Sequence, residues 1–186
     1  MIMKILIKAT VLAVAATAAK IPARCTDNTP DGFRLWANMT YPDVPPDFGP
    51  YVQGQELGYV LHSTECLADV ILVPAGHGSV FRTDGDTVGV ARLGVDDNRP
   101  SAGVVVTPGG TATVPSGRPV ELRCSGGTPG IFLTDYGLEY PEEAGPPGAG
   151  GFMACKTGSG VVLSFFRWGQ RPLLGCTVVQ LLPIYY

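Results

Sequence analysis

Two glycine-flanked serines are the first residues whose type and spacing suggest chemistry. In "GHGS" (76–79) His77 lies two residues before Ser79, and in "TGSGV" (157–161) Ser159 stands between glycines. A serine hydrolase needs a serine, a histidine and a carboxylate that meet in space, and one common form carries the serine in G-x-S-x-G between a strand and a helix. Neither stretch has that pattern. We therefore expect glycine-rich hairpin turns here and predict no catalytic residue.

Paired carboxylates would serve a glycosidase, which holds two carboxyl groups at a fixed separation across the scissile bond. Asp69 and Glu121 lie within apolar, strand-like runs, where an inward-facing carboxyl would be desolvated and a solvent-facing one would be ordinary. A small extracellular hydrolase of this kind is the alternative function that we carry forward. The available acidic residues are Glu65, Asp69, Glu121, Asp135 and Glu139.

We expect neither a metal nor a cofactor. The acidic stretch "RTDGDTVGVARLGVDDN" (82–98) suggests calcium through Asp84, Asp86, Asp96 and Asp97, but it lacks the Asp-x-Asp-x-Asp-Gly spacing with a distal glutamate. Two hairpin turns explain these aspartates as well. Zinc is disfavoured because the cysteines have no C-x-x-C spacing and both histidines stand apart from them.

Two tryptophans are the candidate binding residues. Trp36 falls on the polar face of an alternating stretch, and Trp168 falls at a predicted turn. Exposed aromatic rings on a rigid β scaffold are suited to gripping carbohydrate or protein surfaces. The alternative is that each ring covers an edge of the fold.

Five cysteines predict disulfide bonds with one thiol left over. Cys25 is a candidate for the odd thiol because chain ends are poorly held, although it could equally tie that segment down. Cys66, Cys124, Cys155 and Cys176 are the candidates for disulfide bonds, and the pairing is open at this point.

The first eighteen residues resemble a secretory leader, with Lys4 and Lys8 before an alanine-rich apolar run and small residues at 16–18. The run is too short to span a membrane, which takes about 20 residues. We therefore predict a secreted, extracellular protein with a leader at 1–18, a short segment at 19–31 and a single β domain at 32–183. Asn38-Met39-Thr40 is a potential glycosylation site in such a chain.

The composition disfavours some classes of partner and limits the length of the secondary-structure elements. A net charge of −3 disfavours nucleic acid, and no other stretch is apolar and long enough to span a membrane. Glycine and proline, 25 and 17 residues, cut the chain into short segments. The segments with strand character are 32–40, 57–63, 67–73, 79–82, 88–94, 102–107, 119–124, 130–135, 151–155, 160–166 and 173–182.

These strands predict an all-β antiparallel fold, with a β-sandwich preferred and a closed barrel or trefoil-like fold as alternatives. Residues 64–72 also fit a helix, because apolar side chains recur there every four residues. Residues 40–55 and 140–151 are predicted to be long Pro/Gly-rich surface loops.

The closing stretch carries a geometric constraint. If the strands at 151–155, 160–166 and 173–182 formed a simple meander, the first and third would lie about 10 Å apart, too far for a disulfide. We favour a Cys155–Cys176 bond, which would stabilise by roughly 3 kcal/mol. It requires the first strand to lie beside the last one or to cross to a facing sheet.

The chain resembles an uncharacterised domain family of small secreted fungal proteins. The resemblance covers residues 151–183, through "GFMAC", "LSF", "GQR" and "GC", together with "GFRL" at 32–35. It implies a leader and an extracellular β-rich domain, and it supplies no catalytic or binding residues. We therefore predict a non-catalytic surface or cell-wall binding module, with a polysaccharide or an extracellular protein as its partner.

Overall fold

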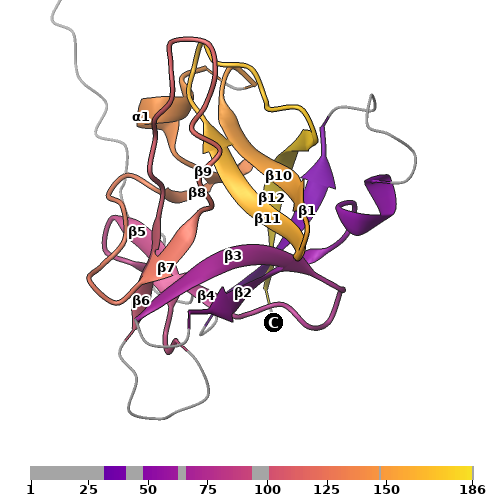
Figure 1. Cartoon of the computed structure of the whole chain (residues 1–186). Helices are drawn as coiled ribbons and strands as arrows, with labels where there is room; N and C mark the ends of the chain where they lie inside the picture. The colour runs from indigo at the N-terminus through magenta and orange to yellow at the C-terminus, as the bar shows by residue number, and fades with distance from the viewer. Residues whose placement is uncertain (1–31, 41–47, 63–65, 94–100, 147, 186) are drawn as a thin grey trace, which may run out of the picture.

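The computed structural model describes residues 32–40, 48–62, 66–93, 101–146 and 148–185, and nearly all regular structure in them is β (Figure 1). The prediction of an all-β fold is confirmed. The strands are β1 (Phe33–Met39), β2 (Glu56–Leu61), β3 (Leu67–Val73), β4 (Phe81–Asp84), β5 (Thr87–Val90), β6 (Ala102–Val105), β7 (Glu121–Arg123), β8 (Phe132–Thr134), β9 (Gly137–Glu139), β10 (Gly151–Thr157), β11 (Gly160–Phe166) and β12 (Cys176–Tyr185).

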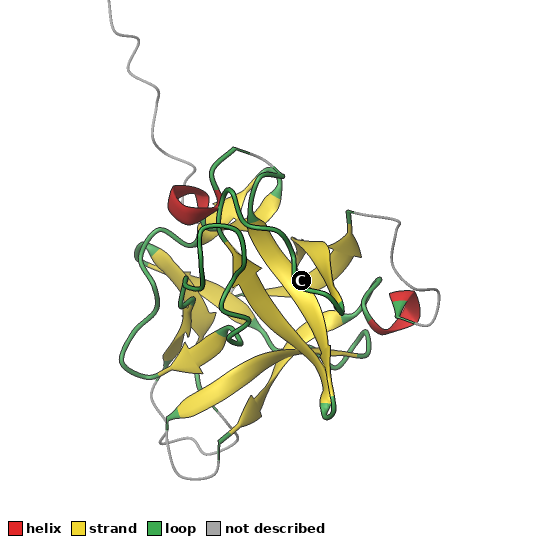
Figure 2. Cartoon of the chain, turned by 45° about the horizontal axis from the view of Figure 1, so that its top comes forward, coloured by secondary structure: helices red, strands yellow, loops and turns green. Residues whose placement is uncertain are grey.

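Two single turns of helix complete the described structure. They are the 3-10 turn η1 (Gly49–Tyr51) and the α-helical turn α1 (Pro141–Ala144), both drawn in red in Figure 2. Both lie within the segments predicted to be loops. No helix in the described residues is long and apolar enough to cross a membrane.

Ten strands form one antiparallel sheet in the order β11-β10-β12-β1-β2-β3-β7-β6-β5-β4, and β8 pairs with β9 separately. The large sheet curls back on itself, since β11 reaches β3 through Val162 and Ile71, and β4 reaches β1 through Phe33 and Phe81. Each closing contact is a single residue pair, so the sheet is not a regular closed barrel. The strands expected to form the two sheets of a sandwich belong to this one continuous sheet, apart from the β8–β9 pair.

Side-chain alternation explains why β1 lies at the centre. Phe33, Leu35 and Ala37 are at most 4% exposed, whereas Arg34 and Trp36 on the opposite face are half-buried. A strand with one apolar face and one polar face is stable where one side covers a core and the other meets solvent. The alternation predicted from the sequence is therefore the burial pattern of the strand.

The segment with two possible structures, 64–72, contributes a strand. From Leu67 the chain pairs with β2 on one side and β7 on the other, and its side chains alternate between buried and half-buried. Pairing on both edges satisfies the backbone of β3 as completely as a helix would, and its β-branched residues favour the extended form. Tertiary pairing thus decides what the local pattern left open.

The last three strands have the layout that a Cys155–Cys176 bond requires. Strand β10 lies between β11 and β12, so the chain does not form a simple meander. Cys155 is directly opposite Cys176 in the antiparallel pair, with their Cα atoms 4.0 Å apart, and the two are joined by a disulfide. A second disulfide joins Cys66 to Cys124 at the ends of β3 and β7.

A buried carboxylate fixes the turn that follows β3. Glu56 is 5% exposed, and its carboxylate accepts hydrogen bonds from the Gly78 N–H at 2.8 Å and from Arg34 Nη1 at 3.3 Å. Burial alone would raise the pKa of Glu56. The backbone N–H groups of Gly76 and Gly78 and the charge of Arg34 outweigh burial, so the pKa lies below its ordinary value.

Substitution of this carboxyl predicts a pH-dependent loss of stability. A carboxyl whose pKa is lowered by folding stabilises the protein above its unfolded pKa, and this contribution is lost as the pH falls through the folded pKa. Glu56→Gln should lower the free energy of unfolding at pH 7 by about 2 kcal/mol, because a charge-assisted interaction is removed. Urea unfolding at neutral and acidic pH measures both effects.

The matched control is Glu142→Gln, which makes the same change at an exposed carboxyl. The two variants should differ at neutral pH and converge in acid. Equal midpoints for the wild type and Glu56→Gln at pH 7 would contradict the assignment of Glu56 as the anchor of this turn.

Candidate binding cleft

Two adjoining cavities lie between the β8–β9 hairpin, the turn α1 with the glycine-rich loop that follows it, and strand β12. Their volumes are about 240 Å³ and about 290 Å³. Tyr136, Glu139, Ala144, Gly148 and Gly150 line both cavities, so the two form one cleft, which we call the α1 cleft.

Buried aromatic rings form the floor of the α1 cleft. The Tyr140 ring lies 5.8 Å from that of Phe165, which makes an edge-to-face contact with Phe152 at 5.4 Å between centroids. Tyr140 is 9% exposed, and its hydroxyl has no hydrogen-bond partner among the described residues. Burial raises the pKa of Tyr140, and the charges of Glu143 and Glu142 raise it further. The phenol therefore stays protonated and can donate a hydrogen bond into the cleft.

Polar and acidic side chains form the rim. Asp135 and Glu139 line the larger cavity, and Gln180 lines the smaller one. Glu139 accepts a hydrogen bond of 2.6 Å from the Thr134 hydroxyl, which fixes its orientation. No lysine, arginine or histidine lines either cavity among the described residues.

A glycine lets the β8–β9 hairpin approach β12. Gly137 has φ +107°, and a Cβ atom there would collide with the carbonyl oxygen of Leu181. Gln180 Nε2 then donates a 2.7 Å hydrogen bond to the Tyr136 carbonyl at the hairpin tip. The Tyr136 side chain is 58% exposed at the edge of the cleft.

Trp168 lies against the loop that borders the cleft on its other side. Its backbone N–H donates to the Glu143 carbonyl at 3.0 Å, and a Cβ atom at Gly145 would come within 2.9 Å of its side chain. Only glycine permits this contact. The indole is nevertheless 68% exposed. The fold thus holds an aromatic ring in place without burying it.

A buried glutamine holds the turn that carries Trp168. Gln170 is 6% exposed, its Oε1 accepts from the Arg167 N–H, and its Nε2 donates to the carbonyls of Gly109 and Thr111, all at 2.8 Å. The loop before β7 is therefore tied to the turn after β11. Removing this amide would leave several buried backbone groups without partners.

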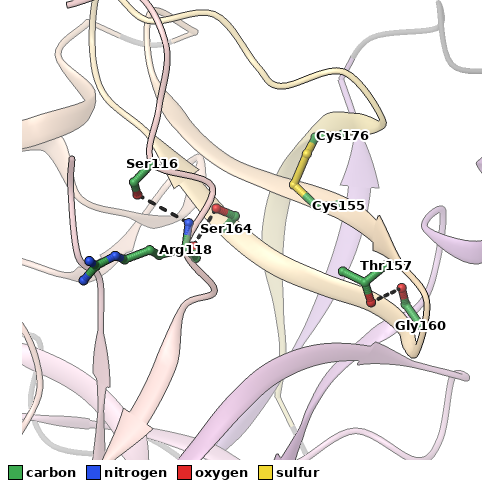
Figure 3. The surroundings of a disulfide bond; sticks show 7 residues. All are labelled: Ser116, Arg118, Cys155, Thr157, Gly160, Ser164 and Cys176. Carbon is green, nitrogen blue, oxygen red and sulfur yellow. Dashed lines mark hydrogen bonds between the residues drawn. A yellow bond between two sulfur atoms is a disulfide. The ribbon is translucent and has the colours of Figure 1, made fainter. Parts of the chain in front are cut away.

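Ser164 ties the same loop to the sheet a few residues further on. Its side chain is fully buried, and its Oγ donates to the Arg118 carbonyl at 2.7 Å (Figure 3). The Arg118 N–H in turn donates to Ser116 Oγ at 3.3 Å. Figure 3 shows Ser164 on β11, the strand next to β10, which carries Cys155 of the Cys155–Cys176 disulfide, so the β10–β11 hairpin contacts the loop beside it.

Comparison with known proteins assigns the chain to a family. The domain of unknown function DUF7907 matches residues 30–185. The chain belongs to the DUF7907 family. Neither the curated proteins nor the solved structures contain a match to it. The resemblance to an uncharacterised domain family is confirmed to this extent. Ser164 and Gln170, which belong to the stretches that carried the resemblance, are buried anchors of loops in this DUF7907 domain.

The two tryptophans occupy different environments. Trp168 lies against Gly145 of the loop that lines the α1 cleft, without lining either cavity itself, whereas Trp36 is half-buried in mid-sheet between Leu182 of β12 and Glu56 of β2. Asn38 follows Trp36 on the same face, and its amide donates to Gln180 Oε1 at 3.4 Å. The face of β1 that carries Trp36 and Asn38 is thus connected to the cleft through Gln180, but Trp36 does not line the cleft. Asn38 stays a predicted glycosylation site.

The serines of the hydrolase hypothesis belong to turns. The Ser159 hydroxyl lies 3.2 Å from that of Thr157 in the β10–β11 hairpin. The Ser79 N–H donates to the Leu57 carbonyl, and the His77 N–H donates to the Pro74 carbonyl. The stretch with Ser159 is the hairpin turn predicted from its glycines, whereas the stretch with His77 and Ser79 lies in the loop between β3 and β4, which do not pair with each other.

The carboxylates divide into two groups. Asp69 and Glu121 are directly opposite each other on β3 and β7. Each has a basic partner of its own: His62 Nε2 lies 3.2 Å from the Asp69 carboxylate, and Arg123 Nε donates to the Glu121 carboxylate at 2.7 Å. Neither lines the α1 cleft. The pair that shares a cavity is instead Asp135 and Glu139. Glu65, like Cys25, Asp96 and Asp97, lies outside the described residues.

The remaining acidic residues suggested calcium. Asp84 lies at the end of β4 and pairs with Thr87 across the β4–β5 hairpin, and Asp86 lies in its turn. The Gly130 N–H donates to the Asp86 carbonyl at 2.8 Å. Among the described residues no group of three or more His, Cys, Asp or Glu is placed to hold a metal ion.

Several residues of the cleft were not singled out in the sequence. Tyr136, Tyr140 and Gln180 come from a hairpin tip, a loop and the last strand, and no local pattern connects them. One signal was present in "DYGLEYPEE" (135–143), where tyrosines alternate with acidic residues before a proline. Glu56 and Gln170 gave no signal, because their partners are backbone groups distant in sequence.

The role of Gln170 can be tested with an isosteric change. An ionised carboxylate is only an acceptor, so Gln170→Glu would place negative charge against the Gly109 and Thr111 carbonyls. We expect a loss of about 3 kcal/mol in the free energy of unfolding. Faster amide hydrogen exchange should be confined to residues 109–114 and 167–171.

The control is Gln53→Glu, the same substitution at an exposed position. If Gln170→Glu and Gln53→Glu unfold at the same urea concentration, Gln170 is not the anchor described above. Slow exchange in 109–114 in the Gln170 variant would contradict it independently.

Proposed function

We propose that this DUF7907 domain is a secreted, extracellular, non-catalytic binding module, and that the α1 cleft binds a polysaccharide of a surface or cell wall. The observation that carries the proposal is a pair of exposed aromatic side chains, Tyr136 at the rim of the cleft and Trp168 against Gly145 of the loop that lines it. Trp168 is 68% exposed and Tyr136 58% exposed, and the backbone around each is held by hydrogen bonds. Aromatic rings of this kind stack on the apolar faces of sugar rings, at little cost in conformational entropy.

The cleft also offers hydrogen bonds that suit sugar hydroxyls. The Tyr140 hydroxyl is a donor, the Glu139 and Asp135 carboxylates are acceptors, and the amide of Gln180 lies at the opposite end. Together the cavities fall within the roughly 300–1,000 Å³ of typical ligand sites, which combine an apolar lining with a few placed polar groups. A polysaccharide needs both kinds of contact.

Secretion is supported by the leader-like residues 1–18, which lie outside the described residues, and by the two disulfides. Disulfides persist in oxidising environments and are rare in reducing compartments. Cys25 is then the odd thiol. Trp36 would extend the binding face along β1, through the hydrogen bond between Asn38 and Gln180.

Binding to insoluble polysaccharides tests the proposal. The protein should be retained on at least one of chitin, β-glucan and cellulose, and Trp168→Ala or Tyr136→Ala should weaken retention about tenfold or more, because truncating a central aromatic contact costs on the order of 2 kcal/mol. Leu174→Ala is the matched control, since Leu174 is an exposed apolar residue of the same β11–β12 connection as Trp168.

The pattern across variants decides the outcome. Loss of retention in the two aromatic variants alone would support the cleft, and a further loss in Trp36→Ala would extend the binding face to β1. Retention unchanged in Trp168→Ala and Tyr136→Ala would overturn the aromatic rim. Failure of the wild type to bind any of the three materials would overturn the polysaccharide.

One observation favours the alternative of a carboxylate-based hydrolase, namely that Asp135 and Glu139 line the same cavity. Under our proposal, incubation with soluble chitin and glucan oligosaccharides should release no new reducing ends. Release that is abolished in Glu139→Gln would establish a glycosidase and overturn the non-catalytic assignment.

A further inference from the structure

The α1 cleft is acidic and lacks compensating charge. Between Arg123 and Lys156 the sequence has no basic residue but has Asp135, Glu139, Glu142 and Glu143. Of these, Glu143 pairs with Arg167 at 4.0 Å. The described residues provide no ion-pair partner for the other three. A concave site with one sign of charge attracts ligands of the opposite sign.

A second observation points to a ligand rather than to a solvated acidic surface. The Tyr140 side chain is nine-tenths buried, lines the cleft, and leaves its hydroxyl without a partner among the described residues. The hydroxyl oxygen is not among the buried unpartnered atoms of the described residues, so it reaches the surface of the cleft that the side chain lines. The phenol is thus free to contact a molecule in the cleft, next to the carboxylate of Glu139, which lines both cavities.

The aromatic rims add a preference for a cation of particular shape. Tyr136 lines the cleft together with Asp135 and Glu139 and is 58% exposed, and Tyr140 lines the smaller cavity together with Glu139. Aromatic faces attract ammonium groups, and carboxylates form charge-assisted hydrogen bonds with them. The flat apolar face of a sugar ring fits the same aromatic surfaces. A sugar that carries a protonated amine satisfies both features at once.

We propose that the α1 cleft recognises an amino-sugar polymer with free amino groups, that is, glucosamine units rather than N-acetylated or neutral ones. The ammonium group lies between Asp135 and Glu139, and the sugar ring packs on Tyr136. The Tyr140 hydroxyl donates to a ring substituent. This inference rests on the proposed function, since it names the class of polysaccharide.

Calorimetric titration with soluble oligomers of equal length tests the selectivity. The glucosamine oligomer should bind at least about tenfold more tightly than the N-acetylglucosamine or glucose oligomer, which corresponds to one charge-assisted contact. Its affinity should fall with added salt, because the attraction is between charges near the surface.

The variants separate charge from shape. Glu139→Gln and Asp135→Asn keep the size of each side chain and should reduce the glucosamine affinity to that of the acetylated oligomer, so that the preference for the free amine is lost. Asp84→Asn is the control, because it removes an exposed carboxylate on β4, outside the cleft. Thermal melting of each variant verifies the fold.

The possible failures are distinguishable. Equal affinity for the glucosamine and acetylated oligomers, or no change in Glu139→Gln, would overturn the amino-sugar inference and leave the proposed cleft intact. Equal binding of a lysine-rich peptide of matched charge would show that the cleft recognises ammonium groups without the sugar, and would also overturn it. No binding of any oligosaccharide would overturn both proposals.

Discussion

The central constraint of this fold is that β1 is hydrogen-bonded on both edges by strands distant in sequence. It pairs with β12 from Phe33 to Met39, meets β2 at Trp36 and touches β4 at Phe33. Because Leu35 and Ala37 are fully buried, a shift of one residue would move the apolar face of the strand into solvent. The register of β1 therefore fixes β12, and β12 fixes the strands and the hairpin that surround the α1 cleft.

Buried polar side chains fix the loops, which have no strand partners in the sheet. Glycine- and proline-rich loops have few backbone partners of their own, and a buried backbone group without a partner is costly. Glu56, Ser164 and Gln170 supply those partners from strand and turn positions. Each is buried, and the free energy lost by removing it from water is offset by several hydrogen bonds for Glu56 and Gln170 and by one for Ser164.

The surface of the α1 cleft differs from this pattern. Trp168 and Tyr136 are exposed aromatic residues, and Asp135 and Glu139 line a cavity to which the described residues contribute no lysine, arginine or histidine. None of these features is needed to satisfy the backbone. A rigid scaffold that displays aromatic rings and uncompensated carboxylates is suited to recognition, because little conformational entropy is lost on binding. The proposed function rests on this difference between buried polar residues that fix the loops and exposed residues that are available to a ligand.

The sequence by itself determined most of the strands and turns, though not β9, and through disulfide geometry it limited β10 to a place beside β12 or in a facing sheet. Alternation and turn chemistry are local, and a covalent bond limits distance directly. Only the tertiary structure decided that 64–72 contains a strand, that Trp36 is enclosed between two strands, and that Asp135 and Glu139 share a cavity whereas Asp69 and Glu121 do not. These outcomes depend on register and on close approaches such as Gly137 against β12, which no local pattern encodes.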